Sequence, residues 1–156
     1  MTLTLITAHD PNLVIGLDGQ LPWRYSEDLK HFKSITLGNT IIMGRGVFEE
    51  LNEKPLPGRR NIVLSRTKDY DNVETFKSLE EALAVLEDKE VFIIGGGILY
   101  KETLPIADKL IITEIGKEYD GDTFFPEYRD QLGINWEEVS RKESDELSFI
   151  EYRRIR

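Results

Sequence analysis

Short apolar runs recur along the chain, and polar or glycine-rich segments separate them. Runs of about four to eight residues that are rich in Ile, Val and Leu are typical of strands buried on both faces of a sheet. The pattern predicts strands at residues 3–8, 40–43, 61–65, 73–76, 90–94 and 110–115.

Between these runs, apolar residues occur at helical spacing. They predict helices at residues 26–38, 47–51, 78–86 and 98–104. Gly38 is a typical end for the first helix, and Pro105 stops the last. Ser78 and Glu81 form a capping box at the start of the third helix. This helix is expected to bury Ala82, Leu83, Val85 and Leu86.

The alternation of strands and helices predicts an α/β fold. We expect a single domain over residues 1–156, with a mainly parallel twisted central sheet and helices on both faces. Residues 136–143 and 148–154, joined by a polar S-D-E-L turn, predict an antiparallel C-terminal hairpin.

Composition and charge argue against several classes of function. The 156 residues include no cysteine and only two histidines, so we expect neither disulfides nor a metal site. The first residues lack the pattern of a secretory signal and no apolar run is long enough to span a membrane, so we expect a cytoplasmic protein. A net charge of −9 argues against nucleic-acid binding. Any anion site therefore needs local cations, and the candidates are Arg45, Arg59, Arg66 and Lys77.

Asp28 is the first candidate for chemistry. It lies four residues before Phe32 and seven before Ile35, so its carboxylate points towards the apolar side of the predicted helix. Burial there raises the pKa of an acid, whereas a helix N-terminus favours its charged form. One interpretation is that Asp28 helps Ser26 to cap the helix, and the other is that it belongs to a binding site.

The segment before this helix favours the binding site. Gly16, Gly19, Pro22 and Trp23 make a loop with few helical or strand options. A loop of this length beside a half-buried acid is typical of a lid over a site. We call residues 16–23 the lid.

A glycine triplet forms a second candidate. Gly95, Gly96 and Gly97 lie between a predicted buried strand and a predicted helix, where backbone can approach a phosphate closely. Their spacing is not that of the G-x-G-x-x-G dinucleotide motif. Tight packing is the alternative explanation of the triplet.

Eight motifs in one order resemble the dihydrofolate reductase family. They are V-I-G at 14–16, L-P-W at 21–23, D-L-x-x-F-K at 28–33, I-M-G-R at 42–45, P-L-P-G-R at 55–59, N-I-V-L-S-R at 61–66, I-G-G-G at 94–97 with Tyr100, and G-D-T-x-F-P at 121–126. The motifs cover nearly the whole chain.

The resemblance implies NADPH-dependent reduction of dihydrofolate to tetrahydrofolate by a monomer, in support of one-carbon and thymidylate metabolism. Hydride would pass to pterin C6, and the adjacent ring nitrogen would be protonated. The implied catalytic residues are Asp28, Trp23, Tyr100 and Thr113. The implied substrate-binding residues are Ile6, Asp28, Leu29, Phe32, Leu51, Lys54, Leu56, Arg59, Ile94 and Thr113. The implied cofactor-binding residues are Ala8, Val14, Ile15, Gly16, Leu17, Asp18, Gly19, Gln20, Arg45, Gly46, Val47, Ser65, Arg66, Lys77, Gly95, Gly96, Gly97, Ile98, Leu99 and Tyr100.

Individual roles also follow from the resemblance. Asp28 and Thr113 would hold the pterin, Arg59 would clamp the substrate α-carboxylate, and a proton would arrive through water near Trp23. Tyr100 would favour the positive charge that develops on the nicotinamide. Arg45, Ser65, Arg66 and Lys77 would surround the 2′-phosphate and adenine of the cofactor.

Further implied features concern the lid and the glycine triplet. Asp122 would hydrogen-bond to the lid near Gly16 and Asp18, and the Gly95–Gly96 peptide would be cis. The chain departs from the family pattern at Val47, where Thr is usual, and at Ile98, where some relatives have Arg.

Two alternatives are weighed against this prediction. A related reductase of a riboflavin precursor would share the sheet and the glycine turn, but it would not be expected to carry the L-P-W loop with Asp28 or the P-L-P-G-R clamp. A non-catalytic dinucleotide-binding module would leave Asp28 and Arg59 without a task.

Overall fold

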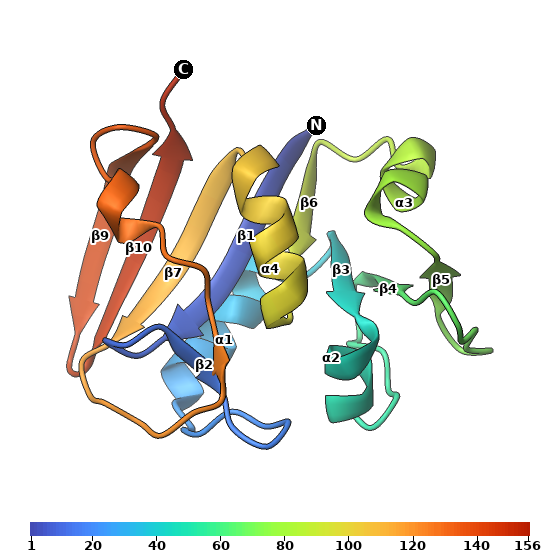
Figure 1. The fold of residues 1–156 in the computed structure, drawn as a ribbon, viewed down its shortest axis with the longest axis horizontal. Helices are drawn as coiled ribbons and strands as arrows, with labels where there is room; N and C mark the ends of the chain where they lie inside the picture. Colours follow the sequence, from blue (N-terminus) through green and yellow to red (C-terminus); the bar gives the residue numbers. More distant parts are fainter.

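The computed structural model describes all residues, 1–156, and shows an α/β fold built on one large sheet (Figure 1). The strands are β1 (Thr2–His9), β2 (Val14–Gly16), β3 (Thr40–Gly44), β4 (Arg60–Leu64), β5 (Glu74–Phe76), β6 (Glu90–Ile93), β7 (Lys109–Ile115), β8 (Thr123–Phe124), β9 (Trp136–Ser144) and β10 (Leu147–Arg154). The helices are α1 (Ser26–Thr36), α2 (Arg45–Glu50), α3 (Leu79–Val85) and α4 (Gly97–Thr103), with 3₁₀ turns at Leu104–Ile106 and Arg129–Gln131.

The eight strands of the main sheet run in the order β5-β4-β3-β6-β1-β7-β10-β9. All neighbouring pairs from β5 to β7 are parallel, and β10 pairs antiparallel with both β7 and β9. The mainly parallel sheet with an antiparallel C-terminal hairpin is therefore confirmed. The parallel arrangement places the carboxyl ends of β1, β3, β6 and β7 along one edge, the usual ligand-binding edge of such sheets.

Helices cover both faces of the sheet, as predicted. Ala82 of α3 and Leu99 of α4 pack with Leu5 and Ile62 in one core cluster. Phe48 of α2 packs with Ile41 in a second cluster, and Phe32 of α1 lies against it. Figure 1 shows α4 in front of the sheet and α1 behind it. None of the helices is long and apolar enough to cross a membrane.

Some predicted helix details are wrong. α1 ends at Thr36 rather than Gly38, because the chain turns away at Gly38, which has a φ of 82° and donates its N–H to the Gly58 carbonyl. Val85 is 53% exposed rather than buried, since it ends a helix that turns only one side to the core. The Ser78 hydroxyl accepts from the Glu81 N–H as predicted, but the Glu81 carboxylate accepts from the N–H of Lys77.

A second, two-stranded sheet lies at the start of the lid. β2 pairs antiparallel with β8, so residues 14–16, where no strand was predicted, form a short strand. The prediction failed because the partner strand lies far along the chain, in the segment after β7. Gly121 lies directly against β2. A Cβ added to Gly121 would lie 2.1 Å from Cγ1 of Val14 and 2.9 Å from the Gly16 carbonyl oxygen.

We expect Gly121→Ala to destabilise the protein, because the methyl group would force β2 away from the loop. Overpacking of this kind typically lowers the free energy of unfolding by roughly 1–3 kcal/mol. Chemical denaturation measures the change. Gly46→Ala is the control, since a Cβ at this helical position meets nothing within 4 Å and should leave stability equal or slightly higher. Equal stability of the Gly121→Ala and native proteins would contradict the expectation.

Candidate functional site

A cavity of about 430 Å³ opens at the carboxyl edge of the sheet. Ile6 and Ala8 near the end of β1, Ile94 just after β6 and Thr113 near the end of β7 form its floor, while α1, α2 and the lid form its walls. The position follows from the fold, because parallel strands end together at this edge.

Asp28 lies in the first turn of α1 and faces this cavity. The residue that caps the helix is Tyr25, which makes no side-chain capping bond, so the capping interpretation of Asp28 is not supported. Instead, Oδ1 of Asp28 accepts a hydrogen bond of 2.6 Å from the buried hydroxyl of Thr113. Oδ2 has no protein partner and is free to bind a ligand.

Burial sets the proton affinity of this acid. Desolvation raises the pKa of Asp28, and the Thr113 hydrogen bond and the nearby His31 oppose the rise only in part. A carboxyl group in such surroundings holds a proton more readily than a surface aspartate does.

An apolar slot leads from Asp28 to a cation. Four predicted side chains line the slot: Leu29, Phe32, Leu51 and Leu56. Arg59 lines the same cavity, with Nε donating to the Pro57 carbonyl at 2.9 Å and Nη1 donating to the Thr36 hydroxyl at 3.3 Å. Arg59 forms no salt bridge, and burial lowers its pKa. Its charge is therefore available for an anionic ligand.

The structure brings most of the predicted site residues together. Those that line the cavity are Ile6, Ala8, Ile15, Gly16, Gly19, Gln20, Asp28, Leu29, Phe32, Val47, Leu51, Leu56, Arg59, Ile94, Gly95, Gly96, Tyr100 and Thr113. Those outside its walls are Val14, Leu17, Asp18, Trp23, Arg45, Gly46, Lys54, Ser65, Arg66, Lys77, Gly97, Ile98 and Leu99.

Three apolar residues of the second group are buried elsewhere. Val14 and Trp23 pack in a small cluster with Ile115, and Leu99 belongs to the largest core cluster. The Trp23 ring lies edge-on to Tyr119 at 5.2 Å between centroids, and its buried Nε1 has no hydrogen-bond partner. Any role of these side chains at the ligand is therefore indirect or needs water.

The residues predicted to surround the 2′-phosphate of the cofactor follow the ends of neighbouring strands. Gly44 pairs with Leu64, and Leu64 with Phe76, so the residues that follow them, Arg45, Ser65 and Lys77, lie at one edge of the sheet. Arg45 is less available to an anionic ligand than the other cations here, because its Nε forms a salt bridge of 2.9 Å with Oε1 of Glu49. Arg66 and Lys77 are exposed and form no salt bridge.

The glycine turn lies between this edge and the cavity. The Gly95–Gly96 peptide is cis, as the resemblance implied. Gly95 has a φ of 116° and lies against the Tyr100 ring, and its carbonyl accepts from the Gly44 N–H at 2.8 Å. The Tyr100 hydroxyl donates to the Ile6 carbonyl at 2.6 Å, and burial raises the pKa of this phenol. The side chain of Ile98 is 79% exposed beside the turn.

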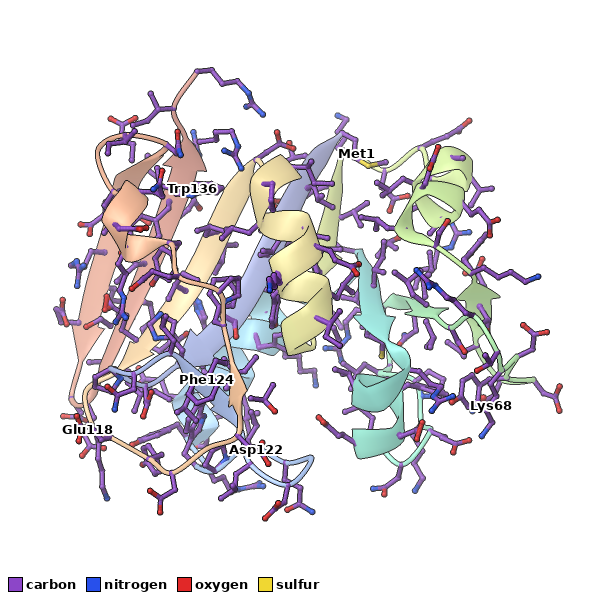
Figure 2. All side chains as sticks on the ribbon, in the orientation of Figure 1. Met1, Lys68, Glu118, Asp122, Phe124 and Trp136 are labelled. Carbon is purple, nitrogen blue, oxygen red and sulfur yellow. The ribbon has the colours of Figure 1, made fainter.

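The lid is tied down by the segment after β7. Asp122 donates its N–H to the Gly16 carbonyl at 2.9 Å, and its Oδ2 accepts from the Asp18 N–H at 3.1 Å. The predicted contact between Asp122 and the lid is therefore confirmed. Figure 2 shows Asp122 and Phe124 together at the end of the molecule where the lid lies.

A cluster of polar side chains joins the segment just after the lid to the final hairpin. The structure shows Tyr25, just after the lid, with its hydroxyl 2.6 Å from that of Tyr119 and 2.8 Å from Oε2 of Glu146 in the hairpin turn. Each partner lies in a different loop, so no local pattern could have identified the cluster.

Several cavity residues were missing from the predicted site. They are Thr7, Leu21, His31, Lys33, Glu50 and Thr123. Helix geometry gave a signal for His31, which follows Asp28 by three residues and therefore shares its side of α1. Glu50 faces the lid near Gly19, and burial raises the pKa of this carboxyl.

Comparisons with known proteins agree with this geometry. A family model described as dihydrofolate reductase matches residues 2–154. The type 3 dihydrofolate reductase of Salmonella typhimurium is 47% identical over 144 residues, which are 90% of this chain and 86% of that protein. The dihydrofolate reductase of Haemophilus influenzae is 46% identical over 156 residues, covering 99% of this chain and 89% of that protein.

A solved structure agrees as well. The dihydrofolate reductase of Enterococcus faecalis, complexed with NADP(H) and RAB-propyl, superposes with a TM-score of 0.86 and is 39% identical. The match covers 98% of this chain and 96% of that chain. With both its sequence and its fold matched over nearly their full length, the chain belongs to the dihydrofolate reductase family.

Proposed function

We propose that residues 1–156 form one catalytic domain that reduces dihydrofolate to tetrahydrofolate with NADPH. Hydride passes from the nicotinamide to pterin C6, and the adjacent ring nitrogen gains a proton. The observation that carries the proposal is a single cavity with a half-buried acid, Asp28, and an arginine without an acidic partner, Arg59, joined by an apolar slot. We further propose that the protein acts as a monomer in the cytoplasm.

The substrate matches the cavity group by group. The carboxylate of Asp28 accepts two N–H bonds from the aminopyrimidine edge of the pterin, with Thr113 fixing its orientation. The apolar side chains that contact the aminobenzoyl ring are Leu29, Phe32, Leu51 and Leu56. Arg59 pairs with the glutamate α-carboxylate, because a guanidinium fork matches a carboxylate in geometry and charge.

The cofactor has a place beside the substrate. The glycine turn lets the backbone approach the pyrophosphate, since Gly96 meets only Val47 on the side where a Cβ would point. Arg66 and Lys77 supply charge for the 2′-phosphate, which favours NADPH over NADH. The Enterococcus faecalis relative in complex with NADP(H) supports this choice. Val47 offers no hydroxyl here, so backbone groups carry the diphosphate contact.

When bound, NADPH supplies the hydride, and the protein supplies position, a dry pocket and electrostatics. Asp28 anchors and polarises the pterin, and burial raises its pKa, which favours proton exchange at the ring nitrogen. The buried Tyr100 hydroxyl, on the floor of the cavity, faces the region where positive charge develops on the nicotinamide. Water near Trp23 brings the proton to the pocket.

The direct test is oxidation of NADPH by the purified protein in the presence of dihydrofolate, followed by the absorbance of the reduced nicotinamide. We expect rapid oxidation that requires dihydrofolate and is much slower with NADH. Tight NADPH binding without turnover would instead favour a non-catalytic dinucleotide-binding module. Turnover of a pyrimidine precursor of riboflavin in place of dihydrofolate would favour the related reductase.

Asp28→Asn should keep NADPH affinity and lose most reduction near neutral pH, because the amide can neither hold the proton nor accept both N–H bonds. Loss of a group with a general acid role typically costs about 10²-fold or more in rate. Steady-state turnover and fluorescence titration of NADPH measure the two effects. Undiminished turnover at neutral pH would remove Asp28 from the mechanism.

The same variant should be more stable than the native protein at alkaline pH. The pKa of Asp28 is raised in the folded state, so its contribution to stability is complete at acid pH and is lost as the pH rises through the folded pKa. An asparagine, which does not ionise, avoids this loss. Thermal unfolding across the pH range should therefore show a gain for Asp28→Asn that grows as the pH rises from the ordinary aspartate pKa through the raised folded pKa, and that is constant above it. A gain that is the same at every pH would contradict the raised pKa of this half-buried carboxyl.

Arg59→Leu should weaken dihydrofolate binding and leave NADPH binding unchanged. Loss of charge-assisted hydrogen bonds to the α-carboxylate should raise the dissociation constant by about 10- to 100-fold. Arg60→Leu is the matched control, since Arg60 is exposed and bound to Glu74 at 2.7 Å. If Arg59→Leu weakened both ligands equally, or if Arg60→Leu weakened dihydrofolate as much, the clamp would be misassigned.

A further inference from the structure

Glu49 is paired with one of the residues predicted to surround the 2′-phosphate of the cofactor. Arg45 is the first residue of α2, and its Nε lies 2.9 Å from Oε1 of Glu49, about one helical turn further along. Both side chains are nearly half exposed. The pair therefore lies in solvent, at the edge of the sheet that Ser65 and Lys77 share, and it can open without disturbing the core.

A second contact directs Arg45 towards the loop after β4. Its Nη1 donates to the hydroxyl of Thr67 at 3.3 Å. Thr67 directly follows Ser65 and Arg66, which the family resemblance also places around the 2′-phosphate. The guanidinium therefore bridges α2 and this loop, beside the position proposed for the phosphate.

The two contacts use most of the guanidinium fork. Nε faces Glu49 and Nη1 faces Thr67, so Nη2 is the nitrogen that neither contact uses. A guanidinium binds a phosphate most strongly through two parallel N–H bonds. Arg45 can offer two nitrogens only if it gives up one of its present partners. Glu49 is the partner that opposes phosphate binding, because its carboxylate has the same sign of charge as the phosphate, whereas the Thr67 hydroxyl is neutral.

The stability of α2 does not explain this pair. An arginine in the first turn and a glutamate in the last turn both oppose the helix dipole. At a spacing of four residues, the order in which the acid precedes the base is also the more stabilising one, and α2 has the reverse order. The placement of Glu49 therefore needs another explanation, and its contact with Arg45 provides one.

We propose that Glu49 is a specificity-determining residue that competes with the cofactor 2′-phosphate for Arg45 and so limits the preference for NADPH over NADH. The inference rests on the proposed function. In the free protein, Arg45 pairs with Glu49. When a 2′-phosphate binds, the guanidinium turns from the carboxylate to the phosphate, and breaking the pair weakens binding. NADH has a hydroxyl in place of this phosphate, so the pair stays closed when NADH binds.

The test is equilibrium binding of NADPH and of NADH to the native protein and to Glu49→Gln, followed by fluorescence. Glutamine keeps the size of the side chain and removes its charge. Exposed ion pairs are weak, so we expect NADPH to bind about two- to fivefold more tightly and NADH affinity to be unchanged. Glu137→Gln is the matched control, because it removes one exposed negative charge from β9, at the opposite edge of the sheet. It should leave both affinities at their native values.

A second background shows whether the effect passes through Arg45. In Arg45→Gln, Glu49 has no guanidinium to hold, so adding Glu49→Gln should leave NADPH affinity nearly unchanged. A gain as large as that in the native background would show that Glu49 repels the phosphate directly. Competition for Arg45 would then be rejected.

Two results for Glu49→Gln alone would also overturn the inference. Unchanged NADPH affinity would show that the pair does not oppose the phosphate. Weaker NADPH binding would show that Glu49 holds Arg45 in place for the phosphate instead of competing with it. A native protein that binds neither NADPH nor NADH would overturn the proposed function itself, and the role of Glu49 with it.

Discussion

The hydrogen bond from Thr113 to Asp28 joins two separate parts of the fold at the point on which the site depends. Thr113 is fixed by the sheet, through β7, whereas Asp28 lies at the start of a helix that follows the lid. The bond orients one carboxylate oxygen and leaves the other open to the cavity. Because burial works against ionisation, the same arrangement also raises the pKa of this carboxyl.

Arg59 is an unpaired charge in a chain whose net charge is −9. Six of the ten arginines form salt bridges, whereas Arg59 and three others form none. Arg59 is instead held by a carbonyl and a hydroxyl, which fix the guanidinium without neutralising it. Long-range repulsion of anionic ligands is thus offset by a charge placed at the point of contact.

The features that could be predicted from the sequence are those that the local spacing of residues determines. Periodicity identified the strands of the parallel sheet, the final hairpin and the side of α1 that carries Asp28, and the colinear motifs identified most of the cavity residues. Features that depend on partners distant in the chain were missed: the pairing of β2 with β8, the Tyr25 cluster, and the contact of His31 with Phe149. Periodicity also placed Val85 inside, because spacing alone does not show where a short helix leaves the core.

The stem of the lid is held by more contacts than its tip. Its stem is fixed by the buried Trp23 and by the Tyr25, Tyr119 and Glu146 cluster, which ties it to both neighbouring loops. Its tip, residues 18–21, is exposed, and its contact with the loop after β7 is one bond of 3.1 Å from Asp18 to the fully solvated Asp122. Opening the tip breaks few contacts, whereas moving the stem would expose an aromatic cluster. A movement confined to the tip would therefore leave Asp28 and its end of the cavity undisturbed.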